Sequence, residues 1–179
     1  MFKGKIGIYK LDAANKERGL SGAVFEVKNS VGKVFDTITT NKDGYAETIE
    51  LPVGEYKIQE ITPPAGFILS DAVKTVTLTT EDKTTAIFEL TNTANSMKLR
   101  KLDSKTKLPL AGAKIQVMSA DGKLYKEGVT DKDGYITLTE VPAGKYTWKE
   151  AVAPEAYSID EKVYAFTMGN DGKVTGDIQ

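Results

Sequence analysis

A lysine, a glutamate and an asparagine occupy comparable places in three alternating stretches of the first half of the chain. In each stretch every second residue is apolar, and the polar residue ends the series. Because alternate residues of a β-strand share one face, each polar side chain is expected to point into the core. The three series are Ile6, Ile8 and Lys10; Tyr56, Ile58 and Glu60; and Phe88, Leu90 and Asn92.

An inward lysine and an inward glutamate in one core should lie near each other, because neither is usually buried without a partner. One outcome is a buried ion pair between Lys10 and Glu60, with Asn92 as a further hydrogen-bonding partner. The other outcome is chemical, because burial favours a neutral amine beside a protonated acid. Lys10 would then attack the side-chain amide of Asn92 while Glu60 shuttles protons, and ammonia would leave. The product would be a Lys-Asn isopeptide bond.

The amino-acid composition excludes most other kinds of catalytic and metal-binding site. The 179 residues include no cysteine and no histidine, which excludes disulfides, thiol nucleophiles, imidazole bases and most zinc or redox-metal sites. The 24 basic and 25 acidic residues are interspersed, so the net charge of -1 indicates neither a nucleic-acid nor a membrane partner. No apolar run approaches the roughly 18 residues of a transmembrane helix. We therefore expect a soluble chain that needs neither a cofactor nor a metal.

The chain repeats one unit at an offset of about 90 residues. Within each copy, short alternating stretches punctuated by Gly, Pro, Asn and Asp indicate strands rather than helices. About seven strands in roughly 90 residues favour a small antiparallel β-sandwich. The predicted fold is all-β, with one sandwich domain over residues 1–94 and a second over 95–179. The repeated segments are Leu20-Ser-Gly-Ala and Leu110-Ala-Gly-Ala, and Lys42-Asp-Gly-Tyr and Lys132-Asp-Gly-Tyr.

The second copy keeps the lysine and the glutamate, as Lys101 and Glu150, but not the asparagine. Alignment of the two copies places the expected acceptor three residues beyond Gln179, so the second domain is predicted to lack its last strand and to stay without a cross-link. Asp177 is not a substitute, since it aligns with the outward-facing Ile87. Lys101 would be an unpaired donor beside its catalyst Glu150, open in principle to a strand donated by another chain. The inward series are Met97, Leu99 and Lys101, and Tyr146, Trp148 and Glu150.

An ordered set of motifs runs through both copies. In the first it comprises Lys10-Leu-Asp, Leu20-Ser-Gly-Ala-Val-Phe, Asn41-Lys-Asp-Gly-Tyr, Gly54-Glu-Tyr-Lys-Ile-Gln-Glu, Pro64-Ala-Gly-Phe and Leu90-Thr-Asn-Thr. This set resembles the Cna-B type (SpaA-like, prealbumin-like) repeats of Gram-positive surface proteins and pilins. In that family a lysine of the first strand and an asparagine of the last form an intramolecular isopeptide bond, with a glutamate as catalyst. The resemblance implies those roles for Lys10, Asn92 and Glu60.

The resemblance also implies a function and a location. The chain would be a structural stalk or spacer module of an adhesin or pilin, at the cell surface or in the cell wall of a Gram-positive bacterium. Its partners would be neighbouring domains of a longer surface protein, and the module itself would be a monomer. The alternative is an adhesin module whose sandwich loops bind a host or carbohydrate ligand, although no loop is singled out. A multiple-turnover enzyme is not expected, because the inferred reaction consumes one of its own groups.

Two Asp-Gly segments, Asn41-Lys-Asp-Gly and Asp131-Lys-Asp-Gly, resemble part of an EF-hand calcium loop. A complete loop needs further oxygen ligands that end in a glutamate at the right spacing. Asp-Gly between two strands is more typical of a hairpin turn. We therefore expect turns at both segments.

Overall fold

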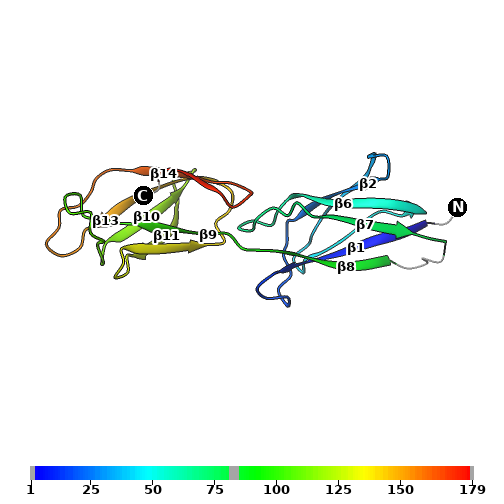
Figure 1. Ribbon diagram of the computed structural model, residues 1–179, viewed down its shortest axis with the longest axis horizontal. Coiled ribbons are helices and arrows are strands. Elements are labelled where there is room, and N and C mark those ends of the chain that lie inside the picture. The colour runs from blue at the N-terminus through cyan, green and yellow to red at the C-terminus, as the bar shows by residue number, and fades with distance from the viewer. Residues whose placement is uncertain (1–2, 81–84, 178–179) are drawn as a thin grey trace. The chain divides into compact units, whose positions relative to one another are not determined.

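The computed structural model describes residues 3–80 and 85–177, which divide into two compact units (Figure 1). The first unit ends at Ala94 and the second begins at Asn95. Every regular element within the described residues is a β-strand, which confirms the all-β prediction. None of the described residues belongs to a helix long and apolar enough to cross a membrane.

The first unit is a sandwich of two sheets. In one sheet β1 pairs with β4, β5 and β8, and in the other the order is β3-β2-β6-β7 with all pairs antiparallel. The strands are β1 (Lys3–Asp12), β2 (Val24–Asn29), β3 (Val34–Thr39), β4 (Tyr45–Glu47), β5 (Leu51–Pro52), β6 (Gly54–Thr62), β7 (Val73–Leu78) and β8 (Thr85–Asn92).

The first and last strands of this unit lie side by side (Figure 1). They pair in parallel, whereas the other strand pairs of the unit are antiparallel. The chain leaves β7 in one sheet and enters β8 in the other, so β1 and β8 are not joined by a hairpin, which would require them to be antiparallel. β1 is therefore hydrogen-bonded to the strand that closes its own unit.

The predicted alternation is confirmed by burial. Ile6 and Ile8 are fully buried on β1, and Ile58 is fully buried on β6. These residues pack in one core with side chains of β2, including Phe25 and Val27. On β8, Phe88 and Leu90 are half-buried against the same core. The inward faces of three strands thus converge between the two sheets.

The second unit repeats this plan with a separate core around Trp148 and Phe166. Its sheets have the orders β12-β9 and β11-β10-β13-β14-β15. The last described strand pairs antiparallel with β14, and within residues 95–177 β9 pairs with β12 alone. The place that β8 takes beside β1 is therefore not filled by a described strand of this unit. The strands are β9 (Ser96–Arg100), β10 (Lys114–Ser119), β11 (Leu124–Val129), β12 (Tyr135–Thr139), β13 (Gly144–Val152), β14 (Tyr164–Met168) and β15 (Val174–Gly176).

Candidate functional site

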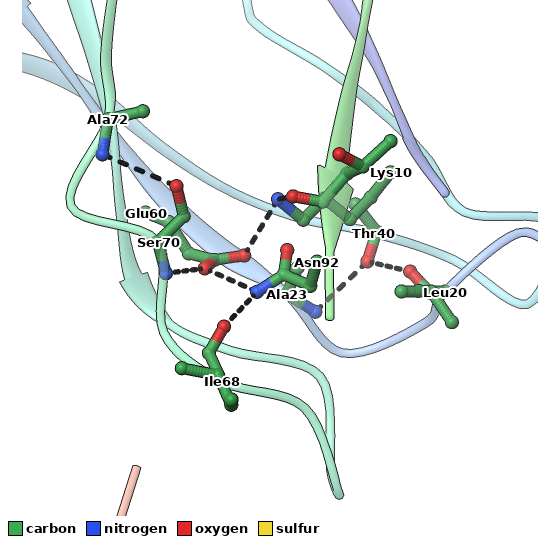
Figure 2. A network of polar contacts seen from close by, with 10 residues as sticks. Lys10, Leu20, Ala23, Thr40, Glu60, Ile68, Ser70, Ala72 and Asn92 are labelled. Atoms are coloured by element: carbon green, nitrogen blue, oxygen red, sulfur yellow. Dashed lines mark hydrogen bonds and ion pairs between the residues drawn. The ribbon is translucent and has the colours of Figure 1, made fainter. Parts of the chain in front are cut away.

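Lys10, Glu60 and Asn92 lie close together in the first unit (Figure 2). They come from β1, β6 and β8, and their exposed fractions are 1%, 3% and 3%. Strand parity predicts all three to face inward, and the structure brings them together. Asn92 closes β8, the strand that lies beside β1 in the same sheet, while Glu60 reaches the cluster from the opposite sheet.

The Glu60 carboxyl group contacts both nitrogen atoms of the cluster. Its Oε1 atom lies 3.3 Å from Lys10 Nζ. Its Oε2 atom accepts a hydrogen bond of 2.8 Å from Asn92 Nδ2 and another of 2.8 Å from the Ser70 backbone N–H. Asn92 Nδ2 also donates to the carbonyl oxygen of Ile68 at 2.6 Å. One carboxyl group thus bridges the amine and the amide nitrogen.

Two buried oxygen atoms of the cluster lack an aligned hydrogen-bond donor among the described residues, Glu60 Oε1 and Asn92 Oδ1. The Lys10 contact to Glu60 Oε1 has the distance of an ion pair without the alignment of a hydrogen bond. Buried polar atoms are nearly always satisfied in native proteins, and exceptions concentrate at sites of strain or chemistry. The Asn92 carbonyl is thus open to polarisation by a proton.

Burial of the Lys10 amine favours its neutral form, although its polar contacts favour the charged one. The amine lies 5.5 Å from the ring centroid of Phe25 and donates a hydrogen bond of 3.2 Å to the carbonyl oxygen of Thr91. Burial lowers the pKa of Lys10, and the Glu60 carboxylate opposes that shift only in part. A lysine with a lowered pKa supplies more of the neutral amine, which is the nucleophilic form.

The backbone of Lys10 is fixed on both sides by the repeated motifs. Its N–H donates to the carbonyl oxygen of Gly44, and its carbonyl oxygen accepts from the N–H of Leu20, both at 2.7 Å. Gly44 has a φ of 79° and lies so close that an added Cβ would collide with the Lys10 carbonyl. Asn41 closes the same turn, because its Oδ1 accepts from the N–H groups of Asp43 and Tyr45. The Asn41-Lys-Asp-Gly motif therefore supports the lysine.

The Asp131 motif of the second unit is built in the same way. Asp131 Oδ1 accepts hydrogen bonds from the N–H groups of Asp133 and Tyr135, and the Lys101 N–H donates to Gly134. The described residues include no group of three acidic side chains placed to hold a metal ion. Both Asp-Gly motifs are turns that position a lysine, as expected, but neither closes a hairpin, because each joins strands of two different sheets, β3 to β4 and β11 to β12.

In the second unit Lys101 and Glu150 also meet. Lys101 Nζ lies 3.6 Å from Glu150 Oε2 and 3.3 Å from Asp160 Oδ2. Sequence reasoning missed Asp160, which lies in an irregular segment where strand parity gives no information. The available signal is its alignment with Ser70, because a carboxylate there would face the same lysine. Asp177 is exposed and hydrogen-bonds with the backbone of Ala165, away from this cluster.

Comparison with known proteins identifies the two units. Residues 4–94 and 95–179 each match the SpaA family of prealbumin-like fold domains. The solved structure titled the Bacillus anthracis TIE protein is 35% identical and superposes with a TM-score of 0.59, covering 96% of this chain and 32% of that one. This likeness therefore includes both units of the chain.

Two surface proteins are similar over shorter stretches of the chain. The trypsin-resistant surface T6 protein of Streptococcus pyogenes serotype M6 is 43% identical over 68 residues, which is 38% of this chain and 13% of that protein. The collagen adhesin of Staphylococcus aureus is 35% identical over 79 residues, 40% of this chain and 7% of that protein. The chain thus spans a small part of the length of these relatives. It belongs to the SpaA family of prealbumin-like fold domains and carries two tandem copies of that domain.

Proposed function

We propose that the first unit cross-links itself through an isopeptide bond between Lys10 and Asn92, with Glu60 as catalyst. The observation that carries the proposal is the position of the Glu60 carboxyl group. It lies 3.3 Å from the nitrogen that would attack and accepts a hydrogen bond of 2.8 Å from the nitrogen that would leave. A group in that position can move a proton from one nitrogen to the other.

The proposed reaction balances without an outside reagent. The Lys10 ammonium gives a proton to Glu60, and the neutral amine attacks Cγ of Asn92. As the C–N bond forms, Glu60 protonates the amide nitrogen and takes the second amine proton. The bond from Cγ to Nδ2 breaks and ammonia leaves. Contact within the folded core replaces a collision in solution, which is the main source of rate in such intramolecular reactions.

A cavity borders the amine and the carboxyl group of the cluster. It has a volume of about 350 Å³ and is lined by Lys10, Glu60 and Ser70, together with Thr91 of β8. Ammonia is smaller than this space. The reaction consumes the Asn92 amide, so the protein acts on itself once and does not turn over.

The proposed bond would join the first strand of the unit to the last. It would close a loop of roughly 80 residues, which contributes on the order of 4 to 5 kcal/mol in the loop-entropy model. If the unit were pulled through β1 and β8, the covalent bond would carry the load and the strands between them would not be stretched. A chain without cysteine would thus have a cross-link that does not depend on redox conditions.

We further propose that the chain is a structural stalk or spacer module of a Gram-positive cell-surface protein, joined to neighbouring domains and outside the cell. Two relatives support this role, a surface T6 protein and a collagen adhesin. They match 38% and 40% of this chain. A module of this kind transmits force between neighbours, a task to which a covalent link between terminal strands is suited.

Intact-mass measurement of the 179-residue chain tests the cross-link. The expected mass is one ammonia below the sequence value, and Glu60→Gln should restore the full mass because the proton carrier is lost. Glu150→Gln is the matched control in the second unit and should leave the deficit unchanged. Fragmentation should locate the link between peptides that contain Lys10 and Asn92. A wild-type chain of full sequence mass would contradict the proposal.

A further inference from the structure

A second carboxylate faces the lysine of the second unit. Asp160 lies in the segment after β13, and its Oδ2 atom accepts a hydrogen bond from Lys101 Nζ at 3.3 Å. The same ammonium lies 3.6 Å from Glu150 Oε2. In the described part of the first unit, Glu60 is the one carboxylate in ion-pair contact with Lys10. The two lysines therefore differ in the number of carboxylates around them.

Asp160 is held in place on several sides. Its Oδ2 atom accepts from the Tyr164 hydroxyl at 2.8 Å, and its Oδ1 atom accepts from the Lys162 N–H at 3.0 Å. Its own N–H donates to Glu150 Oε2 at 2.6 Å. The Tyr164 ring stacks on Trp148 with centroids 4.4 Å apart. The carboxylate is thus positioned by side chains that are themselves fixed by packing.

The first unit has the same backbone at this place but not the carboxylate. Ser70 stands at the position of Asp160, and Lys74 stands at the position of Tyr164. In both units the backbone N–H of the first of these positions donates to the glutamate of its own unit. The second unit therefore adds a carboxylate, and the hydroxyl that holds it, to a shared scaffold.

The added charge opposes the proton transfer that the first unit allows. Lys10 and Glu60 can exchange one proton and become neutral together. In the second unit, transfer from Lys101 to Glu150 would leave the Asp160 carboxylate without its cation. A carboxylate this close to an amine favours the charged form of the amine. Partial burial raises the pKa of Asp160, but its hydrogen bonds together outweigh burial and lower that pKa, so the carboxylate stays ionised at neutral pH.

Other charged groups border the same space, a cavity of about 630 Å³. Its lining includes Arg100 from the end of β9 and Asp103, Lys105 and Lys107 from the following loop. The Asp103 carboxylate is occupied by N–H groups and the hydroxyl of its own loop. The carboxylates in ion-pair contact with Lys101 within the described residues are Glu150 from β13 and Asp160 from the segment after it.

We propose that Asp160 is a positioning residue that holds Lys101 as a charged ammonium and keeps it from acting as the nucleophile that Lys10 is. The inference rests on the function proposed for the first unit, because it contrasts two copies of one reactive pair. In the second unit, the ion pair with Asp160 limits the reactivity of Lys101. Removal of the Asp160 charge should make the Lys101 amine more reactive.

The test is the rate at which cyanate carbamylates Lys101, measured by peptide mass spectrometry on the full chain. Cyanate is small and reacts with the neutral amine. At about pH 7, Asp160→Asn should react about tenfold faster than wild type, because one close negative charge is lost. The excess should shrink as the pH rises through the titration range of lysine, because a growing share of the amine is then neutral in both proteins. A purely structural opening of the site would not produce this pH profile.

Three further variants sharpen the result. Asp160→Glu keeps the charge and should retain the wild-type rate. Tyr164→Phe keeps the stacking on Trp148 but loses the hydroxyl that holds Asp160, so its rate should be intermediate. Asp103→Asn removes a carboxylate that borders the same cavity without contacting Lys101, and should change nothing. Equal rates for wild type and Asp160→Asn at about pH 7, or an excess that does not fall as the pH is raised above about 10, would overturn the proposal.

The same samples separate this inference from the proposed function. Their intact masses report ammonia loss in the first unit, while carbamylation reports Lys101 in the second. Full sequence mass with a tenfold change at Lys101 would reject the cross-link and support the role of Asp160. Loss of one ammonia without any change at Lys101 would reject the role of Asp160 and support the cross-link.

Discussion

Lys10 lies directly opposite Leu90 in the parallel ladder between β1 and β8, which makes Asn92 the next inward residue along β8. Successive inward residues of a strand are about 6.6 Å apart. A lysine side chain that lies along the sheet can span this distance, whereas a shorter amine could not. The parallel register therefore places a lysine and an asparagine two positions apart in the ladder where the proposed reaction needs them.

Loss of the link should lower the stability of the first unit. In Asn92→Ala the proposed bond cannot form, and the loop-entropy model gives a loss on the order of 4 to 5 kcal/mol. Denaturant unfolding monitored by the three tyrosines of the first unit, Tyr9, Tyr45 and Tyr56, measures the change. Lys101→Met is the control, because it alters the corresponding lysine in the unit that is expected to lack the link. Equal losses in the two variants would contradict a cross-link confined to the first unit.

Strand parity was sufficient to identify the candidate cluster from sequence. It placed Lys10, Glu60 and Asn92 inward because a period of two depends on the strand alone and not on its neighbours. The direction of the β1–β8 pair was beyond this reasoning for the same reason, since parity is identical in parallel and antiparallel ladders. The division of the Glu60 oxygens between the two nitrogens depends on side-chain packing, which has no sequence period.

The features that the sequence did not predict lie in irregular segments between the strands. Asp160 was missed because its side chain is aimed by local hydrogen bonds and by Tyr164, not by strand alternation. The neighbouring Ala156 stands where the first unit has Gly66, yet the turn is retained, with φ values of 70° and 85°. Alanine adopts this left-handed conformation at a cost of about 1 to 2 kcal/mol, which the surrounding fold must supply.

Gly44→Ala should both destabilise the first unit and slow the cross-link. The new Cβ would be forced against the Lys10 carbonyl, and the positive φ would cost about 1 to 2 kcal/mol by itself. Gly22→Ala separates these effects, because Gly22 has a φ of 81° but no atom within 4 Å of an added Cβ. Urea unfolding and the intact mass of freshly expressed protein measure the two consequences. Identical behaviour of both variants would mean that contact with Lys10 is unimportant.

Moving the second carboxylate into the first unit should slow its reaction. Ser70→Asp places a negative charge at the position from which Asp160 faces Lys101, and so should favour the ammonium form of Lys10. The fraction of chains at full sequence mass, followed in time after a pulse of expression, should decay more slowly than in wild type. Ser70→Asn has nearly the same shape without the charge, and its decay should match the wild type. Equal slowing by both variants would point to shape instead of charge.

Without the Lys10–Asn92 bond, the first unit should become more stable as the pH rises toward 10.5, because of the titration of Lys10. Asn92→Ala leaves Lys10 as a free buried amine whose pKa in the folded state is lowered by burial from its ordinary value of 10.5. Between the folded and unfolded pKa values, the unfolded chain binds a proton that the folded chain does not, so the free energy of unfolding rises with pH. The slope can reach about 1.4 kcal/mol per pH unit.

The matched variant for this measurement is Lys10→Met in the Asn92→Ala background. The difference in unfolding free energy between the two proteins, obtained by urea titration at each pH, isolates the Lys10 contribution. Other groups that titrate in this range cancel in the difference, including Tyr45, whose pKa is raised to about 12 by burial and by its hydrogen bond to Glu47. Tyr45 alone would lower stability above pH 10, since the unfolded tyrosine ionises first. If the difference in unfolding free energy does not change with pH up to 10.5, the pKa of Lys10 is the same in the folded and unfolded chains. Burial would then not favour the neutral amine that the proposed reaction needs.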